Sequence, residues 1–187
     1  MAAGRWEYLW LAFLGQPKSD RQLYRLIKRH QPRRIVELGI GSVDRALRLI
    51  RVSQRYAAGQ PVSYAGLDRF EERSESMAPI KLIDAHRRLK ATGAEVRLMP
   101  GGPTAGLPSV ANALSDTDLL LISPEADEAA LESAWFFLPR MLTPQTVILR
   151  ATSPAGDAGR AEQVSWAALT MEEIECRATA GAAKRAA

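Results

Sequence analysis

A glutamate and two glycines lie where an apolar run gives way to a helical pattern. Glu37 stands in the run 34–38, which we expect to form a strand. Gly39 and Gly41 follow it, and helical spacing begins near Val43. Glycine lets the backbone approach a ligand closely, and a helix N-terminus offers unpaired amide groups and a partial positive charge. This arrangement predicts a site for a polar ligand at the end of the strand.

A second carboxylate, Asp68, ends the next apolar run, 62–67. In doubly wound folds an acidic residue at this place accepts the ribose hydroxyls of a nucleotide. We therefore expect the ligand to lie across the carboxyl ends of the first two strands. Asp44 stands three residues after Gly41, where the dinucleotide fingerprint has a glycine or alanine. A carboxylate there disfavours a nicotinamide or flavin dinucleotide.

The segment Glu37-Leu-Gly-Ile-Gly-Ser42 resembles the first motif of class I S-adenosylmethionine-dependent methyltransferases. The resemblance covers roughly residues 34–150 in element order. It implies that Glu37 helps to hold the methionine amino group, that the glycines pass beneath the adenosine and that Asp68 binds the ribose. The cofactor would be S-adenosylmethionine and its product S-adenosylhomocysteine. The implied cofactor-binding residues are Glu37, Gly39, Gly41, Ser42, Asp68, Arg69, Gly101, Gly102 and Ser123. An ordinary strand–turn–helix without a ligand is the alternative.

Two parts of this implied site are open to a second interpretation. Gly101 and Gly102 follow the third expected strand, where the family contacts the adenine or the methionine half, but they could equally make only a turn. Glu125 and Asp127 could offer oxygen ligands to a hard cation. Carboxylates before a helix are more often charges that favour its N-terminus, so we predict no metal site.

The segment after the fourth expected strand holds the catalytic residues in this family, and here it begins Ser123-Pro124. This matches only part of the Asn/Asp-Pro-Pro-aromatic pattern of amino-methylating enzymes. The layout of residues 107–138 is closer to that of small-molecule O-methyltransferases, in which Ser123 would occupy the place of a metal-binding aspartate. His30 and His86 lie in expected helices, away from the strand ends. We therefore assign no catalytic residue.

The order of patterns predicts the elements that would position this site. Alternating helices and short apolar strands indicate an α/β fold, with a doubly wound, mostly parallel sheet and helices on both faces. The expected strands are 34–38, 62–67, 95–99, 118–122 and 146–149. The expected helices are 6–14, 19–30 with Ser19 as N-cap, 43–56, 79–90, 107–114, 129–138 and one that starts at Thr170. Only 37 residues follow Arg150, fewer than the further helix and two-strand hairpin of the resembled family usually occupy. The resemblance therefore implies a shortened C-terminal edge of the sheet.

Length and composition indicate one domain. The 187 residues are 47% hydrophobic and 25% charged, as in ordinary globular proteins. We expect a helical extension at 1–31, a cofactor-binding core at 32–150 and a short C-terminal segment at 151–187. In that last segment, Thr170 and Glu173 have the spacing of a capping box, and residues 178–187 are low in complexity.

Charge and cysteine content limit the compartment and the partners. Cys176 is the single cysteine, which suits a reducing compartment, so we expect a cytoplasmic protein. The apolar run 8–14 is far shorter than the roughly 20 residues of a spanning helix, so we expect no membrane partner. The net charge of +4 comes from residues spread along the chain, which disfavours nucleic acid.

The leading functional hypothesis is methyl transfer from S-adenosylmethionine to a small or medium acceptor, with oxygen preferred. A catalytically inactive methyltransferase-like binding or assembly module is the alternative, and an RNA methyltransferase is a third. The expected partner is a small-molecule acceptor. The aromatic N-terminal residues Trp6, Tyr8, Trp10 and Phe13 favour packing or a homodimer contact over stacking on a substrate.

Overall fold

The computed structural model describes residues 2–75, 77–126, 131–132, 134–152 and 165–186. The strands are β1 Arg34–Leu38, β2 Ser63–Asp68, β3 Glu95–Pro100, β4 Leu119–Ile122, β5 Val147–Thr152 and β6 Ser165–Leu169. The α-helices are α1 Arg5–Phe13, α2 Asp20–His30, α3 Val43–Tyr56, α4 Leu82–Lys90, α5 Gly102–Val110 and α7 Met171–Ala186. Short 3₁₀ helices are η1 Phe70–Glu72, η2 Ala111–Leu114 and η3 Trp135–Arg140.

The six strands form one mixed sheet in the order β3-β2-β1-β4-β5-β6. Strand β1 lies between β2 and β4 and is parallel to both. The chain runs from β1 to β2 and β3 on one side of β1, and the connection after β3 crosses back to β4 on its other side. Among the described strands only β6 is antiparallel, and it pairs with β5 at the edge. The doubly wound, mostly parallel sheet that the sequence predicts is confirmed, and the antiparallel edge consists of this one strand.

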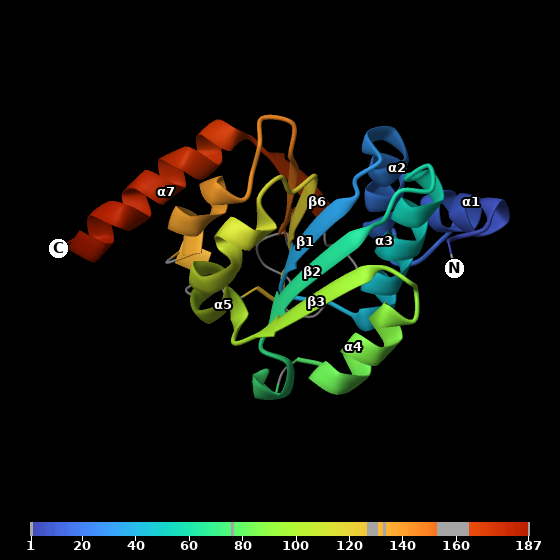
Figure 1. Cartoon of the computed structure of the whole chain (residues 1–187), viewed down its shortest axis with the longest axis horizontal. Coiled ribbons are helices and arrows are strands. Elements are labelled where there is room, and N and C mark those ends of the chain that lie inside the picture. The colour runs from blue at the N-terminus through green and yellow to red at the C-terminus, as the bar shows by residue number, and fades with distance from the viewer. Residues whose placement is uncertain (1, 76, 127–130, 133, 153–164, 187) are drawn as a thin grey trace.

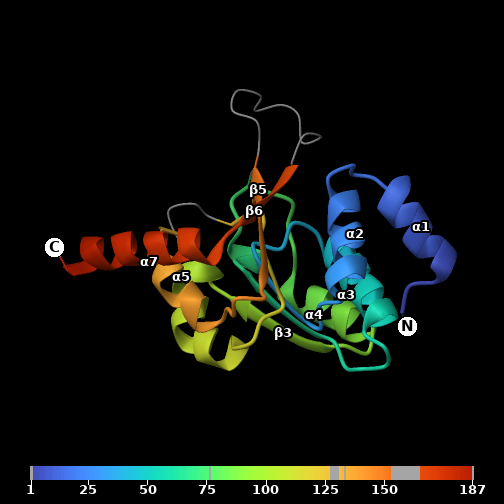
Figure 2. The same cartoon turned by 90° about the horizontal axis from the view of Figure 1, so that it is seen from above.

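Helices cover both faces of the sheet (Figures 1 and 2). On one face α2, α3 and α4 bury Leu23, Ala46 and Leu89 against strand residues such as Ile35. On the other face α5, η3 and α7 pack against β1, β2 and β4 in a second apolar cluster. Helix α1 lies outside α2 (Figure 2) and is bound to the fold mainly through it. The carboxyl ends of the parallel strands are therefore held between two packed layers.

Local sequence signals explain the starts of two helices, α3 and α7. Ser42 caps α3, because its hydroxyl accepts a hydrogen bond from the Arg45 amide at 3.1 Å. The expected capping box is confirmed at α7, where Thr170 N donates to Glu173 Oε2 at 2.8 Å and Glu173 N donates to Thr170 Oγ1 at 3.2 Å. Ser19 precedes α2 as expected, but its side chain makes no capping bond.

Several expectations for the elements need correction. Strand β6 was not expected, since its five residues are mostly small and show little alternation. The helix expected at 107–114 starts at Gly102 instead, with Pro103 in its first turn, a position that suits proline. Ile83, one of the apolar residues of the helix expected at 79–90, is exposed. Residues 129–130 and 133 of the helix expected at 129–138 lie outside the described residues.

Candidate functional site

Glu37 is fully buried at the end of β1, within a cluster of polar side chains from four elements. Its Oε1 accepts hydrogen bonds from Arg45 Nη2 at 2.5 Å and from Ser123 Oγ at 3.1 Å. Its Oε2 accepts one from the Tyr64 hydroxyl at 2.6 Å. A carboxylate has about four acceptor positions, so three are filled from within the chain. We call Glu37, Arg45, Tyr64 and Ser123 the Glu37 cluster.

Arg45 is the cation of the Glu37 cluster. Burial lowers the pKa of its guanidinium, but the charge and hydrogen bond of Glu37 outweigh burial and hold that pKa above its ordinary value. Arg45 Nη2 also donates to Ser123 Oγ at 2.7 Å and lies 3.9 Å from Glu125 Oε2. The guanidinium stands 5.5 Å from the centre of the Trp166 ring, a cation–π contact from β6. Arg45 thus joins β1, β4 and β6 at one edge.

The Tyr64 hydroxyl stays protonated in this cluster. Its burial, followed by the charge of Glu37 and its hydrogen bond to that carboxylate, raises the pKa of Tyr64 well above the usual value for tyrosine. Tyr64 is therefore a hydrogen-bond donor to Glu37 at neutral pH and not a general base.

Asp68, at the end of β2, is buried and has four donors. Oδ1 accepts from Phe70 N at 2.8 Å and from Arg73 Nε at 2.7 Å. Oδ2 accepts from Ile40 N at 2.7 Å and from Arg73 Nη2 at 2.6 Å. The Arg73 pair is bidentate, the strong and directional form of this interaction. In this state all four acceptor positions of Asp68 are used.

Gly39 turns the chain out of β1 beneath the segment that follows β4. Its φ is +74°, which favours glycine, and an added Cβ would lie 2.7 Å from the Glu125 carbonyl carbon. The backbone at Glu125 and Ala126 therefore packs directly on the turn.

A cavity of about 440 Å³ opens on the other side of this contact, at the carboxyl ends of β1 and β2. It is lined by Gly39, Leu67, Asp68, Arg69, Arg73, Ser74, Met77, Gly102, Pro103, Pro124, Glu125 and Ala126. We call it the Asp68 cavity. Its volume falls within the range of small-molecule sites.

The structure brings together some of the residues that the sequence predicts for the site and separates others. Gly39, Asp68, Arg69 and Gly102 border the Asp68 cavity. Glu37 and Ser123 lie in the neighbouring Glu37 cluster, which Glu125 links to the cavity. Gly41 and Ser42 face a different hollow, toward α4. Gly101 precedes α5 with a φ of +94° and does not line the Asp68 cavity.

Sequence reasoning missed Arg45 and Arg73, the partners of the two carboxylates. Arg45 gave a signal, because a cation in the first turn of a helix is disfavoured by the helix dipole and needs a nearby anion. Arg73 lies in the segment after η1, where neither periodicity nor a motif points to Asp68.

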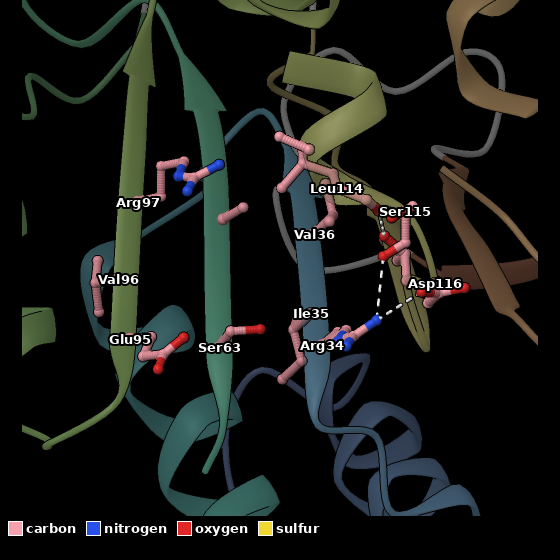
Figure 3. A pocket seen from close by; sticks show the side chains of 13 residues that line it. Arg34, Ile35, Val36, Ser63, Glu95, Val96, Arg97, Leu114, Ser115 and Asp116 are labelled. Carbon is pink, nitrogen blue, oxygen red and sulfur yellow. Dashed lines mark hydrogen bonds and ion pairs between the residues drawn. The ribbon is translucent and has the colours of Figure 1, made fainter. Parts of the chain in front are cut away.

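A second cavity, of about 370 Å³, lies at the opposite, amino-terminal end of β1, β2 and β3 (Figure 3). The side chains of Arg34 and Asp116 form an ion pair at its wall, with a distance of 3.0 Å. It contains none of the residues predicted for the site. Ligands of open α/β sheets bind beyond the carboxyl ends of the strands, so we assign the candidate site to the Asp68 cavity.

Metal ligands do not gather in the described part of the chain, where no group of three His, Cys, Asp or Glu residues could hold an ion. Asp127, one of the two oxygen ligands considered above, lies outside that part. Glu125 Oε2 is buried and accepts no hydrogen bond from the described residues. Glu125 is thus a carboxylate at the cavity wall with an unused acceptor.

The comparisons with known proteins bear on the fold. The O-methyltransferase TomG from Streptomyces achromogenes, solved with SAM, superposes on 91% of this chain and 68% of its own with a TM-score of 0.51 and 14% identity. Cofactor-bound Rv0187 from MTB covers 92% of this chain and 71% of its own with a TM-score of 0.52 and 17% identity. The chain has the Rossmann-like methyltransferase fold. Comparison with protein-family models and curated sequences gives no match. At these identities, the methyltransferase fold is what the likeness establishes.

Proposed function

We propose that the protein binds S-adenosylmethionine with its adenosine in the Asp68 cavity and transfers the methyl group to a small acceptor. The observation that carries this proposal is the position of Asp68. It is a buried carboxylate at the end of β2, on the wall of a cavity of about 440 Å³ that Gly39 and Gly102 also line. An acidic residue at this place suits the ribose of a nucleotide in doubly wound folds. TomG, which has the same fold, was solved with SAM, and this supports the same cofactor here.

The adenosine half fits the residues present on one condition. Asp68 already accepts four hydrogen bonds, two of them from Arg73. The ribose hydroxyls would therefore have to replace Arg73 on the carboxylate. Arg73 has other acceptors close by, since its Nη1 also donates to the Ala78 carbonyl at 3.0 Å. The exchange is a local movement of one side chain.

The methionine half fits less well. Glu37 has one acceptor position left for an amino group, and it has no exposed surface. The turn at Glu125 and Ala126 packs on Gly39 and fills the space beside it. Contact between Glu37 and the cofactor thus requires Arg45 to leave the carboxylate and this turn to withdraw.

Once bound, the cofactor supplies a methyl group on a sulfonium centre. The chain would contribute mainly by holding the acceptor in line, because positioning supplies much of the rate in such transfers. Glu125 is our candidate to accept a proton from the acceptor, since its Oε2 has no hydrogen-bond partner among the described residues. We propose oxygen as the acceptor atom, as for the O-methyltransferase TomG. Exposed Cys176 suits a cytoplasmic setting.

A second candidate function is favoured by the arginines themselves. With Glu37 paired to Arg45 and Asp68 paired to Arg73, both carboxylates are neutralised without a ligand. A domain that kept the fold only as a binding or assembly module would be expected to have both carboxylates paired in this way. It would leave Arg73 on Asp68 at every cofactor concentration.

Calorimetric titration with S-adenosylmethionine and S-adenosylhomocysteine separates the two functions. The enzyme proposal predicts binding by the wild type and its loss in Asp68→Asn. Asp116→Asn, which removes an exposed carboxylate from a surface ion pair, is the matched control and should bind as the wild type does. Circular dichroism verifies that each variant is folded.

Arg73→Met adds a test in which the expected result is a gain of cofactor affinity and not a loss. It removes the internal competitor for Asp68, so the enzyme proposal predicts binding of S-adenosylhomocysteine about tenfold tighter or more. The variant should also unfold more easily, by about 3 kcal/mol, because a buried carboxylate loses its partner. If neither the wild type nor a folded Arg73→Met binds at millimolar ligand, the enzyme proposal is wrong.

A further inference from the structure

The outer face of α1 carries a stripe of large apolar side chains. Trp6, Trp10 and Phe13 recur at helical spacing and are 82%, 50% and 55% exposed. Leu9 and Leu14 extend the stripe and are also exposed. The inner face of α1, with Tyr8, Leu11 and Ala12, is buried. Helix α1 is therefore apolar on both sides, and the described part of the chain covers only one of them.

The surroundings of this stripe are strongly basic. Residues 2–31 include six basic residues: Arg5, Lys18, Arg21, Arg25, Lys28 and Arg29. The acidic residues of the same segment are Glu7 and Asp20. Glu7 is paired with Arg51 at 2.8 Å, and Asp20 is buried. The surface next to the stripe thus presents positive charge with little to offset it.

Basic side chains of α2 and α3 also touch the N-terminal segment along its length. Lys28 Nζ lies 5.6 Å from the centre of the Tyr8 ring. Arg55 Nη1 donates to the Ala3 carbonyl at 3.0 Å, and Arg21 Nε donates to the Gly15 carbonyl at 2.8 Å. These contacts fix α1 on the fold, so the stripe lies on a helix whose position is fixed.

We infer that this face of α1 binds the surface of a membrane that contains anionic lipid. Tryptophan prefers the boundary between headgroups and acyl chains. A helix with aromatic and leucine side chains on one face and basic groups around it is the usual form of a helix that lies in that boundary. Each basic residue near an anionic leaflet adds about 1 kcal/mol of attraction. The inference is independent of the proposed function.

This contact differs from a membrane span. In the part of the chain that the structure describes, no helix is long and apolar enough to cross a bilayer. The sequence-based expectation of no membrane partner was drawn from the short apolar run 8–14, which cannot span a bilayer. It does not address binding at the surface.

Two other occupants fit less well. A second copy would bring two cationic surfaces together, and a helix of 9 residues, about 14 Å long, offers far less than the roughly 800 Å² per partner of a stable dimer. Single-stranded RNA would stack its bases on flat aromatic rings. Leu9 and Leu14 in the same stripe give no such surface. Lipid accounts for both the apolar stripe and the positive charge.

Sedimentation of the full chain with large unilamellar vesicles tests the inference. We expect binding to phosphatidylcholine vesicles that contain phosphatidylserine, weaker binding to pure phosphatidylcholine, and a decrease with salt. Binding should shift tryptophan fluorescence to the blue. Trp135 and Trp166 are 1% and 4% exposed, so the shift reports on Trp6 and Trp10.

Variants assign the binding to the stripe and its charge. Trp10→Ser with Phe13→Ser should reduce partitioning at least tenfold, whereas Ile83→Ser, which removes a 66% exposed apolar side chain on α4, should leave it unchanged. Arg25→Gln with Lys28→Gln should weaken binding to anionic vesicles about fivefold per charge. The inference is overturned if the α1 variant binds vesicles as the wild type does. It is also overturned if the wild type does not bind anionic vesicles but self-associates through the stripe. Binding of polyuridylate in place of anionic vesicles would overturn it as well.

Discussion

The two buried carboxylates at the strand ends, Glu37 and Asp68, each form an ion pair with an arginine of the same chain. Arg45 reaches Glu37 from the first turn of α3, and Arg73 reaches Asp68 from the segment after η1. A buried carboxylate without a partner would cost several kcal/mol, so a resting domain needs these counter-ions. The same pairs set the condition for cofactor binding, because a ligand has to compete with them.

Asp20 extends this buried charge network and provides a pH test. Burial is the main cause that raises the pKa of Asp20 above 3.8, its ordinary value. Between that value and the raised one, the folded protein binds more protons than the unfolded chain, so stability falls as pH rises through this window. Asp20→Asn removes this contribution and should be more stable than the wild type at pH 7.

Urea unfolding across pH 3 to 8 measures the effect. The gain from Asp20→Asn should vanish at a pH of about 3, where Asp20 is protonated in both the folded and the unfolded state. Asp116→Asn, at an exposed site, should show no comparable gain. An equal gain at both ends of the pH range would contradict the assignment to Asp20.

At the residue scale, the sequence predicts acidic groups better than their partners. Glu37 and Asp68 follow from the rule that site residues stand at strand ends, and the structure places both there. Ser42 satisfies the same motif, yet its hydroxyl caps α3. Side-chain partners such as Arg73 depend on where a loop folds back, and a sequence pattern does not specify that.

The turn after β1 packs directly against the segment that follows β4. The backbone at Glu125 and Ala126 lies against Gly39, and both residues also line the Asp68 cavity. The contact narrows the space that a methionine chain would use. Movement of the segment after β4 is therefore part of the proposed cofactor binding.

Gly39→Ala tests how tight this contact is. The added Cβ meets both an unfavourable φ and the backbone of the 125–126 turn. Gly59→Ala has a similar φ, +79° against +74°, but open space around it. Gly59→Ala should cost about 1 kcal/mol, and Gly39→Ala about 1 to 3 kcal/mol more. Equal losses in urea unfolding would show that the 125–126 turn does not press on Gly39.

At the element scale, strong periodicity predicted well and weak patterns did not. The bounds of β1 and α3 agree with the sequence analysis, because each has a clear apolar face and a clear stop. Strand β6 was missed because pairing with β5, and not its own composition, makes it a strand. The outward position of Ile83 depends on how α4 packs, which its spacing alone did not reveal.

At the scale of the whole molecule, the strand order of the sheet determines where the candidate site lies. The order β3-β2-β1-β4-β5-β6 puts β1 at the point where the crossovers change direction, and ligands of such sheets bind there. The alternation of helices and strands predicted the doubly wound, mostly parallel sheet but not the order of its strands. The aromatic helix α1 lies outside the sheet layers (Figure 2), and the sequence alone did not show which of its faces is free.

A crystal structure of the protein grown with millimolar S-adenosylhomocysteine tests the central claim most directly. The account predicts ribose hydroxyls within hydrogen-bond distance of Asp68, with Arg73 moved off that carboxylate. It also predicts that the 125–126 turn has withdrawn from Gly39. An intact Arg73–Asp68 pair with no ligand in the Asp68 cavity, or the ligand bound elsewhere, would contradict it.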